Sequence, residues 1–102
     1  MAYRPQRMKF GAFFAPFHND RTNPTLALES DMDLIAYMDK LSYDEAWIGE
    51  HHSGAYECIA SPEIMIGALA EKTRHITLAT GVTSLPYHHP FLVAQRFVHE
   101  NR

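Results

Sequence analysis

Residue types suited to acid–base chemistry stand directly after three short apolar segments of this sequence. Glu50-His51-His52 follows one such segment, the run from Thr80 to Ser84 follows another, and His18 comes soon after the segment 8–14. A histidine titrates near neutral pH and both donates and accepts hydrogen bonds, so these positions suit general acid–base catalysis or contact with a cofactor. Whether they act together depends on the elements that carry them.

Three interpretations of the pair His51-His52 are open from the residues alone. Both could bind a metal ion, but adjacent residues on an extended chain point in opposite directions, and no His-Glu-x-x-His pattern occurs. One histidine could pack structurally while the other stays solvated. The third interpretation, which we favour, is a catalytic or cofactor-contacting His51, with no metal in the site.

Other residues near the apolar segments have both structural and functional interpretations. Phe14 ends the first segment and His18 follows it closely, so both are candidates for substrate contact, although clustered phenylalanines more often form a core. His89, just before Pro90, is predicted mainly to cap a helix. Cys58 has no evident activating neighbour in the sequence, and we expect it to be inert.

Strands and helices alternate along the chain by their hydrophobic periodicity. Short apolar segments predict strands, and apolar residues recurring every three or four positions predict amphipathic helices. Alternation of this kind is typical of an α/β fold with parallel strands and right-handed crossovers, in which strand ends meet at one edge of the sheet. The predicted strands are 8–14, 45–49 and 75–80, adjacent in that order, and the predicted helices cover 24–41, 91–101 and a segment that starts at Ser61-Pro62-Glu63 with Ser61 as N-cap.

The composition excludes several classes of function. A net charge of −3 and a pI near 6.1 argue against a nucleic-acid binder. No apolar run is long enough for a membrane span, and the single cysteine fits a reducing, cytoplasmic setting. Neither G-x-G-x-x-G nor G-x-x-x-x-G-K occurs, which disfavours a Rossmann dinucleotide site and a P-loop.

Three parallel strands with their helices would leave one sheet face and both sheet edges exposed. We therefore expect residues 1–102 to form a single partial domain whose remaining barrel is absent, or one that self-associates. By the same argument, we do not expect the isolated chain to be a well-behaved monomer.

Four segments together resemble the opening part of the bacterial luciferase-like flavin-dependent monooxygenase family, most closely its limonene 1,2-monooxygenase-like members. Each segment alone is weakly specific, but their order and spacing match from Met8 onwards. The segments are Lys9-Phe10-Gly11, Tyr43 to His52, Ala60-Ser61-Pro62 and Gly81 to Pro90.

The resemblance implies the first three βα units of a TIM (β/α)₈ barrel that uses reduced FMN and O₂ to oxidise a small organic substrate, for example a terpene such as limonene. It also implies a flavin reductase as supplier of reduced flavin, and a homo-oligomer. His51 is similar to the family histidine that faces the flavin. Thr80, Gly81 and Val82 match residues that support the flavin ring, with a non-proline cis peptide at Gly81–Val82. The family's phosphate-binding loops come late in the barrel, so we do not expect the isolated chain to bind flavin tightly.

Two alternatives remain open at this point. The same fold could serve a flavin- or deazaflavin-dependent reductase or dehydrogenase, since such enzymes share these early motifs. The chain could also be a non-catalytic half-barrel module that oligomerises.

Overall fold

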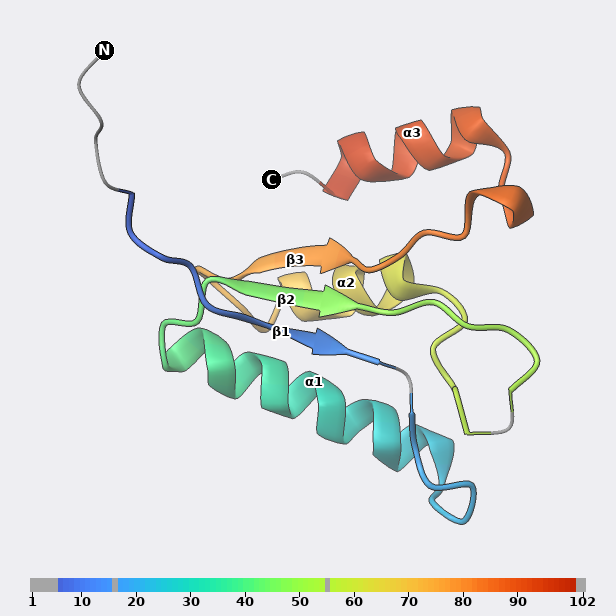
Figure 1. Ribbon diagram of the computed structural model, residues 1–102, viewed down its shortest axis with the longest axis horizontal. Coiled ribbons are helices and arrows are strands. Elements are labelled where there is room, and N and C mark those ends of the chain that lie inside the picture. The colour runs from blue at the N-terminus through green and yellow to red at the C-terminus, as the bar shows by residue number, and fades with distance from the viewer. Residues whose placement is uncertain (1–5, 16, 55, 101–102) are drawn as a thin grey trace.

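The computed structural model describes residues 6–15, 17–54 and 56–100, and these form alternating strands and helices (Figure 1). The strands are short and the connecting helices run back along the sheet, as a parallel crossover requires. In chain order the elements are β1 (Gly11–Phe14), α1 (Pro24–Lys40), β2 (Glu45–Ile48), α2 (Pro62–Ala70), β3 (Thr77–Thr80), the 3₁₀ turn η1 (Leu85–Tyr87) and α3 (Pro90–Glu100).

The sheet has the order β1-β2-β3, and both strand pairs are parallel. The predicted topology is therefore confirmed. The ladder starts later than predicted in β1, at Gly11, because the Phe10 N–H bonds to a side chain instead of to the backbone of the neighbouring strand. The Phe10 N–H donates to the Asp44 carboxylate at 2.9 Å, while the Phe10 carbonyl accepts from the Asp44 N–H at 2.8 Å.

Local capping chemistry explains where two of the helices begin. The Asn23 side chain accepts the Thr25 N–H at 2.9 Å at the start of α1. At the start of α3, Nδ1 of His89 accepts the Phe91 N–H at 3.3 Å, which confirms the predicted capping role. Ser61 occupies the N-cap position of α2 and Pro62 the first turn, as predicted, but the Ser61 side chain makes no capping bond.

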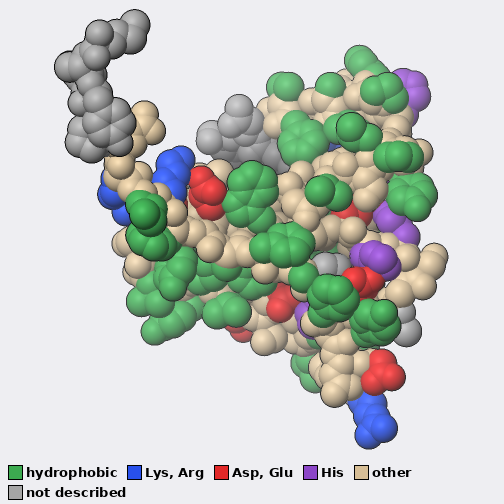
Figure 2. All heavy atoms as spheres, viewed as in Figure 1, with side chains coloured by type: hydrophobic (Ala, Val, Ile, Leu, Met, Phe, Trp, Pro, Cys, Tyr) green, Lys and Arg blue, Asp and Glu red, His purple; other side chains and the backbone are tan. Residues whose placement is uncertain are grey.

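One face of the sheet is covered by α1 and α2 (Figure 1), and the buried core lies between this face and the two helices. The opposite face is open. Phe13 and Trp47 are cross-strand partners on it and remain 61% and 43% exposed. Figure 2 shows hydrophobic side chains exposed across the molecule in this view, with histidines toward the side where the strands end. The core comprises Ile35, Met38, Ala46, Ile48, Ile59, Met65, Ile66, Leu69 and Ile76.

A buried carboxylate joins the end of α1 to the entry of β3. Asp39 accepts backbone N–H groups from Arg74, His75 and Ile76, at 3.0, 2.7 and 2.8 Å. Burial raises the pKa of Asp39, but these three backbone hydrogen bonds outweigh it and lower the pKa below its ordinary value. The link sets the position of β3 from outside the sheet.

Within the described ranges, no helix is long and apolar enough to cross a membrane.

Candidate functional site

The strand ends bring the three predicted clusters to one edge of the sheet. The Gly49 N–H donates to the Phe14 carbonyl at 3.0 Å, and the Gly81 N–H donates to the Ile48 carbonyl at 2.7 Å. The residues that follow each strand therefore leave the sheet side by side. This carboxyl edge is where working residues of parallel α/β folds gather.

The loops after β1 and β2 pair with each other above this edge. Phe17 and Glu57 form an antiparallel bridge, and the His18 N–H donates to the Tyr56 carbonyl at 2.6 Å. The Phe17 and Tyr56 rings stack with their centroids 6.0 Å apart and an interplanar angle of 13°. These contacts fix the two loops as one wall beside the strand ends.

His51 lies in this wall with 47% of its side chain exposed. Its Nε2 contacts Oε2 of Glu57, and its backbone N–H donates to the Ile59 carbonyl at 2.9 Å. The backbone is therefore fixed while part of the imidazole stays accessible. A histidine in this state can exchange a proton or a hydrogen bond with a bound molecule.

The neighbouring His52 belongs to a buried network centred on Glu50. The fully buried Glu50 side chain accepts from Nε2 of His52 at 2.6 Å, from Nε2 of His88 at 3.0 Å and from the Ser84 N–H at 2.8 Å. Burial raises the pKa of Glu50, but the hydrogen bonds from His52, Ser84 and His88 outweigh it and lower the pKa below its ordinary value.

The role of Glu50 could not be predicted from its motif alone. The available signal was spacing, since Glu50 and His52 stand two apart and such residues face the same side of an extended chain. His88 and Ser84 lie more than thirty residues further on. The network ties the segment that leaves β3 to the end of β2.

His18 is held between both loops and α1. Its Nε2 lies 2.8 Å from Oδ2 of Asp31, and its Nδ1 lies 3.3 Å from Sγ of Cys58. The structure thus brings His18 into the same loop wall as His51. The Cys58 thiol, predicted to be inert, has a histidine beside it that the sequence did not reveal.

Gly81 lies on the open face of the sheet, against Phe13 and Trp47. A Cβ atom added to Gly81 would lie 3.4 Å from the Phe13 ring and 3.4 Å from Cβ of Trp47. The Gly81–Val82 peptide bond is cis, as the resemblance implied. Thr80 and Val82 flank this position: the Thr80 hydroxyl accepts from the Thr83 hydroxyl at 2.9 Å, and Val82 is exposed.

Phe14 lies on the other face of the sheet. It pairs in register with Ile48 and packs against the core under the helices. Phe13, the preceding residue, is therefore the β1 phenylalanine on the open face. Because the segment 8–14 is apolar at nearly every position, its pattern did not show which phenylalanine faces which side.

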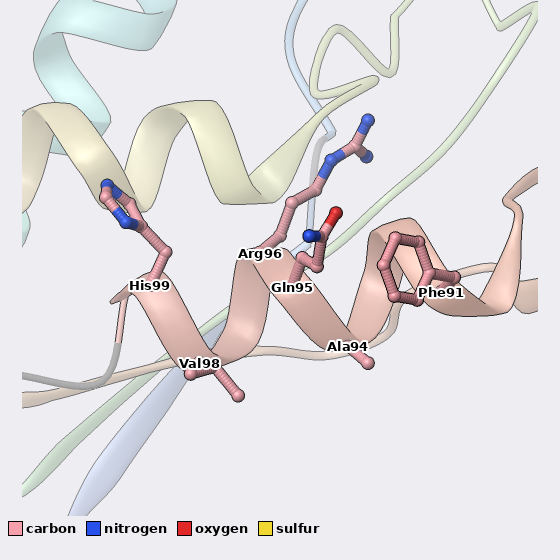
Figure 3. A pocket seen from close by; sticks show the side chains of 6 residues that line it. All are labelled: Phe91, Ala94, Gln95, Arg96, Val98 and His99. Carbon is pink, nitrogen blue, oxygen red and sulfur yellow. The ribbon is translucent and has the colours of Figure 1, made fainter.

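A pocket also lies along α3, away from the strand ends (Figure 3). All of its lining residues belong to α3. The pocket is therefore an uncovered side of this helix, whereas a binding site is usually built from several elements. Among the described residues, no group of three or more His, Cys, Asp or Glu side chains could hold a metal ion. The pocket is lined by Phe91, Ala94, Gln95, Arg96, Val98 and His99.

Comparison with known proteins adds the family to this geometry. A family model described as luciferase-like monooxygenase matches residues 8–99. The chain is 50% identical over 92 residues to limonene 1,2-monooxygenase of Rhodococcus erythropolis, covering 90% of this chain and 24% of the relative. It is 50% identical over 93 residues to 4-hydroxyprotoasukamycin monooxygenase of Streptomyces nodosus subsp. asukaensis, covering 91% and 25%. The chain thus spans about a quarter of the length of these relatives.

Solved structures show the same arrangement of strands and helices. The oxygenating constituent of 3,6-diketocamphane monooxygenase of Pseudomonas putida, a type II Baeyer–Villiger monooxygenase in complex with FMN, matches with a TM-score of 0.82 and 28% identity. The match covers 88% of this chain and 25% of that chain. The monooxygenase RslO1 of Streptomyces bottropensis shares the fold, with a TM-score of 0.84 at 24% identity over 92% of this chain and 29% of that chain.

The three βα units correspond to the amino-terminal part of a luciferase-like (β/α)₈ barrel, as predicted. The family match covers nearly all of the sequence, from the first strand to the third helix. The chain belongs to the luciferase-like monooxygenase family.

Proposed function

We propose that the protein is a flavin-dependent monooxygenase that uses reduced FMN and O₂ to oxidise a small apolar substrate, of which a cyclic terpene such as limonene is the model. The observation that carries this proposal is the juxtaposition of the open aromatic face, Phe13 and Trp47, with the strand-end loops that hold His51. The 50% identical relatives are both named as monooxygenases, which favours oxygenation over a reductase or dehydrogenase activity.

The residues present fit the ring of FMN. An exposed phenylalanine and tryptophan in register give a broad apolar surface, and Gly81 beside them leaves space that a Cβ would fill. Flat aromatic ligands stack well on such surfaces. No phosphate-binding glycine motif occurs in the sequence, so the fit concerns the ring and not the phosphate.

Reduced flavin, when bound, supplies the electrons with which O₂ is activated. We assign to His51 a hydrogen bond or proton exchange at the flavin ring, and to Thr80, Gly81 and Val82 support of that ring. His18 remains a proposed substrate-side residue, from the loop wall, whereas Phe14 lies on the helix-covered face and supports the open face only by packing. This function requires a supply of reduced flavin, for which we propose a flavin reductase as partner. We also propose that the protein forms a homo-oligomer.

The single tryptophan of the chain reports directly on the proposed ring site. Trp47 lies on the open face beside Gly81, so a flavin bound there quenches its fluorescence. We expect FMN and lumiflavin, which lacks the ribityl phosphate, to quench with similar affinity, because the chain offers a ring surface and no phosphate motif. Gly81→Val should weaken the binding of both FMN and lumiflavin, because its side chain fills the space next to Phe13.

A matched control and an activity measurement complete the test. Gly67→Val changes a glycine whose added Cβ meets nothing within 4 Å, and it should leave quenching unchanged. Oxygen uptake with reduced FMN and limonene, with epoxide detected by mass spectrometry, tests oxygenation itself. If Gly81→Val and Gly67→Val change the quenching equally, the result counts against the ring site.

A further inference from the structure

Glu57, in the loop after β2, reaches a ring nitrogen of His51 through Oε2. We propose that Glu57 is a positioning residue for His51, a role that rests on the proposed function of that histidine. Its carboxylate fixes the orientation of the imidazole and the tautomer with the proton on Nε2. Nδ1 is thereby left as the ring atom that accepts a proton or hydrogen bond in the site.

The backbone holds both members of this pair. The Glu57 N–H donates to the Gly54 carbonyl at 3.1 Å, and Glu57 also forms the antiparallel bridge to Phe17. The His51 N–H donates to the Ile59 carbonyl at 2.9 Å. The contact between the side chains therefore follows from two fixed backbone positions, which is the condition for one group to orient another.

Gly54 makes room for the contact. A Cβ atom added to Gly54 would lie 3.0 Å from Cδ2 of His51 and 3.1 Å from Oε2 of Glu57. Ser53, just before it, has a positive φ of 62°, which turns the chain so that Gly54 passes under the pair. A larger residue at position 54 would separate the imidazole from the carboxylate.

Glu57 is nearly buried and His51 is half exposed, as expected if the carboxylate holds the imidazole and the imidazole meets the bound molecule. The Glu57 side chain is 10% exposed, whereas that of His51 is 47% exposed. A carboxylate in such a position needs a hydrogen-bond donor, and His51 is its ion-pair partner among the described residues. Since an ionised carboxylate only accepts, the proton lies on Nε2.

His52 shows that the two adjacent histidines are held separately. Its Nε2 donates to Glu50, inside the network with His88, and not to Glu57. Adjacent side chains on an extended segment diverge, so each imidazole takes its own carboxylate. His52 serves the buried network, while Glu57 is left to orient the more exposed His51.

Ring-nitrogen NMR of the ¹⁵N-labelled 102-residue chain, without flavin, tests this assignment. We expect His51 to show the Nε2–H tautomer. Glu57→Gln removes the charge and should abolish the tautomer preference, and Gly54→Ala should do the same by displacing the ring while leaving the charge in place. Glu63→Gln is the control, because it makes the same chemical change in a different ion pair, with Arg96 at 3.0 Å.

The wild-type spectrum alone can overturn the proposal, whether or not a variant folds. A His51 proton on Nδ1, or equal tautomer populations, would show that Glu57 does not set the ring. So would a preference that survives both Glu57→Gln and Gly54→Ala in chains whose amide spectra remain folded. Loss of the preference in these variants, with no change in Glu63→Gln, supports it.

A kinetic measurement separates this proposal from the proposed function. In oxygen uptake with reduced FMN, Glu57→Gln should lower kcat about a hundredfold, the scale of lost acid–base assistance, with little change in KM for the organic substrate. A rise in KM at unchanged kcat would overturn the positioning role. If the wild-type protein shows no flavin-dependent uptake, the proposed function fails, and the tautomer result still decides whether Glu57 sets His51.

Discussion

Nε2 of His88 lies 3.0 Å from Oε1 of Glu50, although 38 residues separate the two in the chain. The same carboxylate also accepts from the Ser84 N–H, so the segment after β3 is held at two points to the end of β2. That segment begins with Gly81, which lies against Phe13 and Trp47. One buried side chain therefore connects the stability of the fold to the shape of the open face.

Replacing Glu50 should destabilise the chain and loosen the segment after β3. Glu50→Ala leaves two imidazoles and one backbone N–H without their acceptor, and we expect a loss of about 3 kcal/mol in the free energy of unfolding. Urea unfolding followed by circular dichroism measures this loss. Glu45→Ala, which removes a partly exposed carboxylate from β2, is the comparison and should cost far less.

Asp39→Asn should act at the opposite edge of the sheet. An amide in place of the carboxylate cannot accept equally well from Arg74, His75 and Ile76, and we expect a loss of about 2 kcal/mol. Hydrogen exchange should quicken first at the amides of residues 74–77. Asp33→Asn, at a side chain 78% exposed, provides the control; equal effects of the two substitutions would contradict the link.

The stability of the chain should fall in acid because of these same two carboxylates. Asp39 and Glu50 have pKa values lowered from 3.8 and 4.5, so the folded chain binds fewer protons at them than the unfolded chain does. Their contribution is fully present above these ordinary values and is lost as the pH falls through the lowered folded pKa values. Urea midpoints measured from pH 6 downward should decline below about pH 4.5.

The double variant Asp39→Asn, Glu50→Gln checks the origin of that decline. Both substitutions remove the titrating groups, so the variant should be less stable at pH 6 but show a flatter pH dependence below 4.5. An unchanged slope would assign the acid sensitivity to other carboxylates.

His51→Ala should lower turnover of the proposed flavin-dependent reaction by about a hundredfold, as expected when a general acid–base is lost. His52→Ala should lower turnover less but stability more, because its Nε2 donates to the buried Glu50. Oxygen uptake and urea unfolding of both variants measure the two effects. Small and equal effects on turnover would return His51 to a structural role.

The sequence predicted what depends on local periodicity. The order and parallel direction of β1, β2 and β3, the helix positions and the capping by His89 follow from apolar spacing and capping residues, and the structure confirms them. The meeting of the three clusters at one edge follows from parallel topology alone.

The side-chain partners could not be predicted, because they depend on contacts between distant segments. Asp39 meets backbone groups 35 to 37 residues further along the chain, and a helix pattern does not distinguish a buried carboxylate at its end from a solvated one. Nothing in the sequence distinguishes Glu57 from a solvated loop glutamate, because its contact with His51 depends on the turn at Gly54. The face of Phe14 was ambiguous because its neighbours are apolar too.

Asp39 has one more consequence, for how this fold can change over evolutionary time. Its three hydrogen bonds lie at the amino edge of the sheet, whereas the histidine loops lie at the carboxyl edge. A strand positioned from one edge keeps its place when the loops at the other edge are altered. Mutations in the carboxyl-edge loops that spare the buried Glu50 network can therefore alter the open face while β3 keeps its place.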